Sequence, residues 1–212
     1  LAALIGIPYS YLSPQAYIKT NVEGTYNILE SSKYLDIEQT IITSTSEVYG
    51  SAKYVPIDEK HPLSAQSPYS ASKIAADQLA LSYWNSFKLP IKIIRPFNIY
   101  GPRQSSRAVI PSIIIQALNN KDEIKLGNIE PSRDFTYVTD TCDAFLTILK
   151  IKKSFGSILN VGSNNEYTIE NIAKKILKIL NSKAKLKKEK RRIRTQKSEV
   201  IRLVCDNTQI IK

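Results

Sequence analysis

Apolar and polar positions along this chain repeat with two different spacings. Apolar residues recur at helical spacing in residues 20–35, 67–87, 108–120, 138–150 and 168–180. Shorter apolar runs lie between these stretches, at residues 40–45, 91–101 and 157–162. Because helical and strand-like segments alternate throughout, the pattern predicts an α/β fold with a mostly parallel, doubly wound sheet.

Boundary residues support several of these elements. Ser67 and Pro68 form a helix start signal, and Thr168 is a candidate N-cap for the last helix. The proline in 108–120 is compatible with the first turn of a helix. The lysine-rich segment Asn181–Lys190 is the best candidate for a mobile connector.

Composition narrows the class of protein. The chain has 212 residues, 42% of them hydrophobic, which is enough for one domain with a sizeable core. No apolar stretch approaches the roughly 20 residues of a membrane helix, and the start "LAALIGIPYSY" lacks the features of a signal peptide. Cys142 and Cys205 lie far apart without metal-ligand spacing. We therefore expect inert thiols, no metal, no membrane partner and a cytoplasmic location.

The net charge of +11 raises the question of nucleic-acid binding. Residues 1–170 hold 16 basic and 16 acidic side chains, so the excess lies entirely in the last 42 residues, around "KAKLKKEKRRIR". No aromatic residues interleave this run, so it offers no stacking platform for bases. We interpret the run as a solvated face and expect no nucleic-acid partner, although a few of its arginines suit a phosphate-bearing substrate.

The stretch "TIITSTSEVYG", residues 40–50, ends an apolar run in hydroxyls and a carboxylate. One interpretation is a capped turn. The other is a row of catalytic groups at the carboxyl end of a sheet strand, where ligands bind in open α/β sheets.

A second group of polar residues bears on this choice. In "YSASK", Tyr69 and Lys73 lie four residues apart and therefore share one face of a helix. An ammonium group near a phenol lowers the tyrosine pKa, which makes the phenol usable as a base. Taken alone, the pair is better interpreted as a partly exposed pair on a helix face. Together with Thr45, Ser46 and Glu47 at a strand end, it predicts hydroxyl, carboxylate, phenol and ammonium groups in one crevice.

The order of these motifs resembles the extended short-chain dehydrogenase/reductases, in particular nucleotide-sugar dehydratases and epimerases. The segments that carry the resemblance are "LAALIGIPYSY", "TNVEGTYNILE", "TSTSEVYG", "YSASK", "RPFNIYGPRQ", "SRDFTYVTD", "LNVGSNNEYTI" and "RIRTQKSEVIRLVCDNTQ". The resemblance implies that residues 1–100 form the C-terminal part of the NAD(P)-binding Rossmann domain, with strands returning near 136–162. Residues 101–212 would form mainly the smaller substrate-binding part.

Glu47 bears on the subfamily. By resemblance, 4,6-dehydratases carry a glutamate here to remove the proton at sugar C5, and the GDP-mannose dehydratases have Thr-Ser-Glu, as in this chain. The dTDP-glucose dehydratases have an aspartate where Ser46 stands, so the acid that protonates the C6 hydroxyl is left open. The residues of these motifs are most similar to those of legionaminic-acid-pathway dehydratases. This similarity implies a UDP- or GDP-linked N-acetylglucosamine substrate. The alternatives are a 4-epimerase, a UDP-glucuronate decarboxylase, or an inactive remnant.

The resemblance also implies a role for individual residues. The implied cofactor is NAD, with NADP as the alternative, and the implied partner is a second copy of the chain, through helices at Thr20–Leu35 and Ser70–Phe87. The implied catalytic residues are Thr45, Ser46, Glu47, Tyr69 and Lys73. The implied cofactor-binding residues are Ala2, Ala3, Tyr69, Lys73, Pro96 and Phe97. The implied substrate-binding residues are Asn98, Arg103, Arg133 and Arg194, with Arg107 a weaker candidate.

The family's glycine-rich phosphate loop has no counterpart in this sequence, which also lacks the preceding strands. We therefore expect a fragment that binds the dinucleotide poorly and is inactive alone, because loop amides normally hold the pyrophosphate. Other conspicuous residues receive structural interpretations: His61, Asp58 and Glu59 as loop residues, and Trp84 as a packing residue. Asn21 is a candidate for the structural asparagine beside the catalytic lysine.

Overall fold

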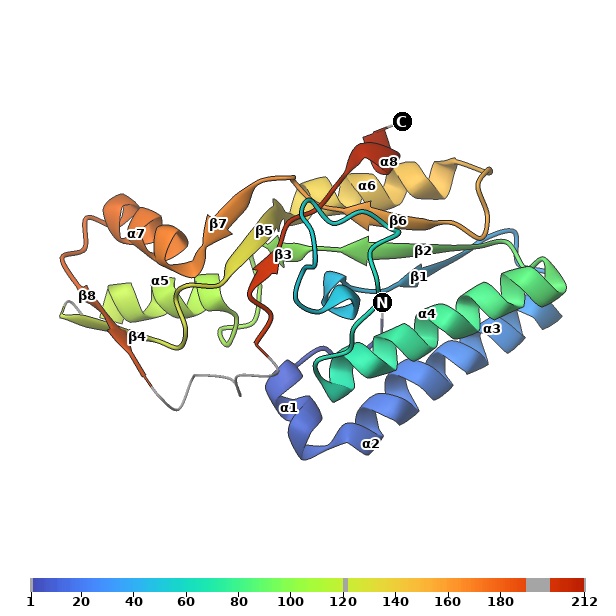
Figure 1. Cartoon of the computed structure of the whole chain (residues 1–212), viewed down its shortest axis with the longest axis horizontal. Helices are drawn as coiled ribbons and strands as arrows, with labels where there is room; N and C mark the ends of the chain where they lie inside the picture. The colour runs from blue at the N-terminus through green and yellow to red at the C-terminus, as the bar shows by residue number, and fades with distance from the viewer. Residues whose placement is uncertain (1, 120–121, 190–198, 212) are drawn as a thin grey trace.

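A parallel sheet and helices on both of its faces organise one end of the molecule (Figure 1). The computed structural model describes residues 2–119, 122–189 and 199–211. The sheet has the strand order β1-β2-β6, and all of its pairs are parallel. Its strands are β1 (Thr40–Thr43), β2 (Ile91–Pro96) and β6 (Ile158–Val161). The parallel sheet that the sequence predicts is therefore confirmed.

Every residue of the central strand β2 is buried, because helices cover both faces of the sheet. Ile91 and Ile93 pack in a core cluster with residues of α3 (Gly24–Tyr34) and α4 (Pro68–Phe87). Ile94 points to the other face and packs in a cluster with residues of α6 (Val138–Lys150). This arrangement makes the fold doubly wound.

A second sheet adjoins the first through the chain that follows β2. Its strands are β3 (Asn98–Tyr100), β5 (Ser132–Tyr137), β7 (Glu166–Thr168) and β9 (Arg202–Leu203). The strand β5 pairs in parallel with β3 and β9 and antiparallel with β7. The prediction of one strand across residues 91–101 was therefore wrong. Pro96 has no N–H to continue a ladder, and the chain passes at Phe97 from one sheet to the other.

A third, two-stranded sheet includes a segment for which the sequence analysis predicted a mobile connector. The segment predicted to be a mobile connector contains β8 (Lys185–Lys188), which pairs in parallel with β4 (Glu123–Leu126). Leu186 packs on a core cluster shared with α5 (Val109–Asn119) and α7 (Ile169–Ile179), while the lysines beside it stay exposed. One apolar residue among lysines is enough to anchor a strand when its side chain faces a core.

Short helices complete the described structure. The chain enters through α1 (Ile7–Leu12), α2 (Pro14–Tyr17) and the π-helix η1 (Ile18–Glu23), which continues into α3, so this helical segment begins before the predicted Thr20. The 3-10 helix η2 (Ser46–Tyr49) follows β1, and α8 (Thr208–Ile211) contacts β6. Thr168 accepts a hydrogen bond from the Asn171 amide at 3.0 Å, which confirms it as the N-cap of α7. None of the helices within the described ranges is long and apolar enough to cross a membrane.

Candidate active site

The carboxyl ends of the three parallel strands meet at one edge of the first sheet. Ser44 extends the ladder past β1, since its amide donates to the Ile94 carbonyl at 2.7 Å. Thr45 then leaves the sheet with φ −164° and ψ 152°, and its hydroxyl accepts from the Glu47 amide at 3.3 Å. Thr45 is therefore the N-cap of η2, so the capped-turn interpretation of this stretch is confirmed.

The helix α4 places Tyr69 and Lys73 beside this turn. Ser67 and Ser70 form a reciprocal capping box at its start, with Pro68 in the first turn. The Tyr69 phenol lies close to the Thr45 side chain, and this contact lowers its pKa. The Lys73 ammonium donates to the Thr43 carbonyl at 2.5 Å. The predicted convergence of Thr45, Tyr69 and Lys73 is thus observed, with all three side chains buried.

The protonation of Tyr69 differs from the expectation. The pKa of Tyr69 is raised to about 12, mainly by burial; the contact with Thr45 opposes this rise, and the negative charge of Glu47 adds to it. Lys73 was expected to lower this pKa but binds the Thr43 carbonyl instead. Burial lowers the pKa of Lys73 itself, and the charge of Asp77 opposes that effect.

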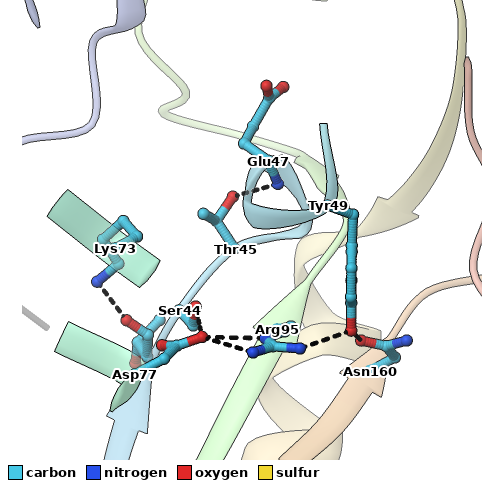
Figure 2. A network of polar contacts seen from close by, with 9 residues as sticks. Ser44, Thr45, Glu47, Tyr49, Lys73, Asp77, Arg95 and Asn160 are labelled. Carbon is cyan, nitrogen blue, oxygen red and sulfur yellow. Dashed lines mark hydrogen bonds and ion pairs between the residues drawn. The ribbon is translucent and has the colours of Figure 1, made fainter. Parts of the chain in front are cut away.

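Glu47 and Ser46 differ in their surroundings. Ser46 is buried in η2, whereas Glu47 is only partly buried. Figure 2 shows the Glu47 carboxylate pointing away from the buried polar groups below it. The Glu47 amide, by contrast, is held on the Thr45 hydroxyl at 3.3 Å.

The second sheet brings two predicted substrate-binding residues to one face. Asn98 of β3 is paired with Phe135 of β5, and Arg133 lies two residues before Phe135, so Asn98 and Arg133 point to the same side. The Asn98 Oδ1 atom is buried and has no hydrogen-bond partner among the described residues. Arg133 donates to the Ser132 carbonyl at 2.8 Å and lies 4.0 Å from Glu199.

The other predicted contact residues are scattered. Arg103 and Arg107 are exposed in the loop after β3, and Arg103 has a left-handed backbone, with φ 65°. Arg194 lies outside the described residues. Ala2 and Ala3 are exposed near the start of the chain, whereas Pro96 and Phe97 are buried at the end of β2.

Asn21 ties the start of the chain to the helix that carries Lys73. Its side chain exchanges two hydrogen bonds with the Leu4 backbone, both at 3.0 Å. It also donates to the Ser72 hydroxyl at 3.0 Å. Asn21 is 2% exposed, so this contact fits the structural role that the resemblance implies.

A buried polar network lies beneath these residues, and the sequence analysis missed it (Figure 2). Asp77 binds Arg95, Arg95 donates to the Tyr49 phenol at 3.0 Å, and the phenol donates to Asn160 at 2.7 Å. Two signals could have revealed it. Asp77 follows Lys73 by four residues on the same helix, and Arg95 interrupts an apolar strand.

Two residues interpreted as loop residues are more firmly held than expected. His61 is 2% exposed, not part of an open polar loop, and it accepts from the Lys53 amide at 2.9 Å. Glu59 accepts from the Asn160 amide at 2.8 Å, and burial raises its pKa. Asp58 accepts from the Tyr54 phenol at 2.7 Å in an exposed position. These partners give all three residues structural contacts within the loop and its surroundings.

Trp84 and the two cysteines are the remaining residues for which the sequence analysis made a prediction. Trp84 packs near Phe155, and a side chain on Gly156 would overlap its indole ring. Cys205 is buried, and burial raises the pKa of its thiol, whereas Cys142 is exposed on α6. Both cysteines are free thiols, but only Cys205 has the inert environment expected of both. Among the described residues no group of His, Cys, Asp or Glu side chains could hold a metal ion.

Comparison with known proteins gives consistent matches along the chain. The family model for GDP-mannose 4,6-dehydratase matches residues 1–212. The chain is 35% identical to human dTDP-D-glucose 4,6-dehydratase, over 84% of this chain and 51% of that protein. It is 37% identical to the enzyme of the same name from Dictyostelium discoideum, over 84% of this chain and 44% of that protein. The chain thus spans about half the length of the curated relatives it matches.

Solved structures match over nearly the whole chain. The structure of DesIV, a dTDP-glucose 4,6-dehydratase from Streptomyces venezuelae with NAD and TYD bound, gives a TM-score of 0.88 at 26% identity. It covers 99% of this chain and 64% of that one. UDP-glucuronic acid 4-epimerase from Bacillus cereus, in complex with UDP-glucuronic acid and NAD, gives a TM-score of 0.91 at 29% identity. That match covers 99% of this chain and 66% of the epimerase.

Proposed function

Since the chain belongs to the GDP-mannose 4,6-dehydratase family of the extended short-chain dehydrogenase/reductases, we propose that it forms part of a nucleotide-sugar 4,6-dehydratase. One observation carries this choice within the family. Glu47 lies two residues after Thr45, its amide donates to the Thr45 hydroxyl at 3.3 Å, and the negative charge of its carboxylate acts on the Tyr69 phenol. A 4,6-dehydratase needs a base for the C5 proton as well as one for the 4-hydroxyl.

NAD is the cofactor of this proposal, and the residues present fit it. The Lys73 ammonium has three N–H donors and uses one of them, toward Thr43, within the described structure. The remaining donors suit the hydroxyl groups of the nicotinamide ribose, and Tyr69, Ala2, Ala3, Pro96 and Phe97 would line the rest of this part of the site. When bound, NAD supplies a hydride acceptor and donor for the sugar.

Tyr69 acts as the base for the sugar 4-hydroxyl. Oxidation at C4 releases the hydroxyl proton, and the phenol, which lies close to Thr45, would accept it. Because burial holds the pKa of Tyr69 near 12, the phenolate needs a compensating positive charge. The ammonium of Lys73, one helical turn away, supplies that charge.

Glu47 acts at C5 and C6. The ketone at C4 acidifies the C5 proton, which the carboxylate removes while the C6 hydroxyl departs. Ser46 stands where an acid would be needed to protonate this leaving group, and a serine hydroxyl is a poor proton donor at neutral pH. We assign this second role to Glu47 as well: it passes the proton that it has just removed to the C6 hydroxyl, which leaves as water. C5 then takes up a proton from solvent when C6 receives the hydride.

The substrate in this proposal is a UDP- or GDP-linked hexose, with N-acetylglucosamine as the sugar. Asn98 and Arg133, on one face of the second sheet, would bind the diphosphate together with Arg194. Planar arginine donors suit phosphate oxygens, and the unpaired Oδ1 of Asn98 is available to a sugar or ribose hydroxyl. Arg103 is a further candidate for the diphosphate.

The proposal includes a homodimer through α3 and α4. Large apolar side chains are exposed on and just beyond these helices, as a helix-to-helix contact would require. They are Tyr26, Ile28, Tyr34, Leu35 and Phe87. Sedimentation velocity should show twice the mass of one chain, and aspartate at Tyr34 should shift the protein toward the monomer.

The function is tested by product analysis in deuterated water with the full-length gene product. The dehydratase should convert the nucleotide sugar to a 4-keto-6-deoxy product that carries deuterium at C5, detected by NMR and mass spectrometry. Glu47→Gln should lower kcat roughly 100-fold or more with little change in binding, while the exposed control Glu23→Gln should not. A sugar epimerised at C4, a pentose, or no turnover at all would contradict the proposal.

A 4-epimerase is the second candidate, supported by the TM-score of the epimerase structure, which is at least as high as that of DesIV. An epimerase leaves the C5 hydrogen untouched. The same experiment therefore separates the two, because its product would carry no deuterium at C5 and would retain the C6 hydroxyl.

A further inference from the structure

Asp77 occupies an unusual position next to the candidate catalytic lysine. It follows Lys73 by one helical turn on α4 and is fully buried, at 0% exposed. Three donors converge on its Oδ2 atom (Figure 2). They are the Ser44 hydroxyl at 2.9 Å, the Arg95 Nε at 3.0 Å and the Arg95 Nη2 at 2.9 Å.

The other carboxylate oxygen of Asp77, Oδ1, differs from Oδ2 in its hydrogen bonding. Oδ1 of Asp77 is buried and has no hydrogen-bond partner among the described residues. A buried carboxylate oxygen without a donor is costly, so an arrangement that keeps one calls for a physical reason. The ion pair with Arg95 alone does not supply that reason, because the guanidinium engages Oδ2 twice and turns its other nitrogen to Tyr49.

The buried charges around Asp77 supply a physical reason for keeping this carboxylate. Lys73 is 5% exposed and Arg95 is 1% exposed, and Asp77 is the carboxylate that lies between these two cations along α4 and β2. An ammonium taken out of water without an opposing charge loses its proton readily. A neutral Lys73 could not favour the phenolate of Tyr69.

We propose that Asp77 is a positioning residue for the proton transfer at Tyr69: its carboxylate, oriented by Arg95 and Ser44, keeps the Lys73 ammonium charged and in place on the Thr43 carbonyl. This inference rests on the proposed function only for its catalytic consequence. The electrostatic coupling of Asp77 with Lys73 is a property of the protein without substrate.

The other groups around Lys73 and Tyr69 cannot substitute for Asp77. From α2, Tyr17 packs edge-on against Tyr69 with ring centres 6.2 Å apart, and Tyr9 of α1 lies behind it. From η1, the uncharged Asn21 reaches Ser72. From α3, Glu30 binds Tyr83 much further along α4.

The remaining charged neighbour, Glu47, disfavours the phenolate of Tyr69 instead of stabilising it. Glu47 of η2 raises the pKa of Tyr69, and so does Asp77, through their negative charges. Arg95 of β2 is already engaged by Asp77 and Tyr49. Among the residues that the structure describes, Lys73 is therefore the cation left to favour the phenolate, and its protonation is the quantity that Asp77 controls.

The test measures the titration of Lys73 directly. The full chain is labelled with 13C at lysine Cε, the Lys73 signal is identified with Lys73→Arg, and the signal is followed against pH. In Asp77→Asn we expect Lys73 to titrate at least about one pH unit lower than in the wild type. Asp143→Asn, the same change at an exposed site on α6, should leave the Lys73 midpoint unchanged.

Two further measurements keep the test decisive. If Asp77→Asn does not fold, the wild-type 13Cγ signal of Asp77, identified with Asp77→Glu, must show a step at the Lys73 midpoint. In the active enzyme, the alkaline limb of the kcat profile should move to lower pH in Asp77→Asn, with KM unchanged.

Failure of this inference and failure of the proposed function would give different results. A Lys73 midpoint that is unchanged in folded Asp77→Asn, or a wild-type Asp77 signal without that step, would overturn the inference. Absence of dehydratase activity would overturn the proposed function and leave the titration result standing, since no substrate is present in that measurement.

Discussion

Tyr69 illustrates how strongly one side chain depends on its surroundings. The residue is 7% exposed, and its phenol lies close to the Thr45 side chain and is influenced by the negative charge of Glu47. Burial and that charge both favour the neutral phenol, so the proposed base would need the compensating charge of Lys73. The spacing of Tyr69 and Lys73 predicts that they share a helix face, but not that the ammonium binds the Thr43 carbonyl.

The raised pKa of Tyr69 predicts a measurable pH dependence of stability. The folded phenol titrates near pH 12, and the unfolded phenol near its ordinary value of about 10. Between these values the unfolded chain has lost a proton that the folded chain keeps, so the free energy of unfolding falls as pH rises through this window. Below about pH 10 the contribution is fully present.

Tyr69→Phe should reduce that fall, as measured by urea unfolding at pH values from about 9 to about 12. The variant should also lack one tyrosine that ionises late in a near-ultraviolet titration. Tyr34→Phe, at an 89% exposed position, is the matched control and should leave the stability curve unchanged. A stability curve identical in wild type and Tyr69→Phe would contradict the raised pKa.

At the scale of elements, the start of α4 is the most closely specified. Ser67 accepts from the Ser70 amide at 3.1 Å, and the Ser70 hydroxyl is bonded to the Ser67 amide at 3.0 Å. The first turn therefore has its free amides satisfied by side chains that are adjacent in sequence. Such local contacts explain why Ser67-Pro68 could be identified as a helix start before any tertiary contact was known.

We predict that Ser67→Ala lowers the free energy of unfolding by about 1 kcal/mol. The hydroxyl is lost from the N-cap, and the Ser70 amide then has no side-chain acceptor. Ser86→Ala, at an exposed position in the last turn of the same helix, should change stability by less than about 0.5 kcal/mol. Urea unfolding followed by circular dichroism measures both, and equal effects would contradict the capping role.

The strand β8 shows what an element-scale analysis of sequence misses. Its segment is rich in lysine, which favours a solvated connector, yet Ala184 and Leu186 alternate with the lysines and face the cluster under α5 and α7. The partner strand β4 lies about sixty residues earlier in the chain. A strand with so little apolar content forms because that distant partner supplies the ladder and the core.

At the scale of the whole molecule, Asp134 joins segments that are far apart in sequence. It is fully buried in β5 and accepts from the Ser163 amide and hydroxyl at 2.8 and 2.6 Å. It also accepts from the Asn164 amide at 2.8 Å and from the Cys205 amide at 3.1 Å. One carboxylate thus fixes the β6–β7 loop and the chain after β9 on the second sheet.

We predict that Asp134→Asn lowers the free energy of unfolding by roughly 3 kcal/mol, because an amide offers one acceptor oxygen and turns a donor toward backbone N–H groups. Amide exchange near Ser163 and Cys205 should accelerate before the rest of the protein responds. Asp143→Asn, at an exposed site, is the control. An unchanged free energy of unfolding in Asp134→Asn would contradict this role.

Local patterns in the sequence alone determined the alternation of helices and strands, the N-caps at Ser67 and Thr168, and the shared helix face of Tyr69 and Lys73. Each of these depends on residues within about one or two turns of each other, so their spacing in sequence is their spacing in space. The catalytic and binding roles of the named residues stay predictions.

Only the tertiary structure decided which strand ends meet, where the chain leaves the first sheet, and what surrounds each polar group. The Asp77–Arg95 pair, the strand β8 and the contacts of Asp134 all join segments separated by many residues. Their formation depends on burial by distant partners, because a charge or an edge strand is stable inside a protein only when another segment satisfies it. A single sequence does not specify those partners.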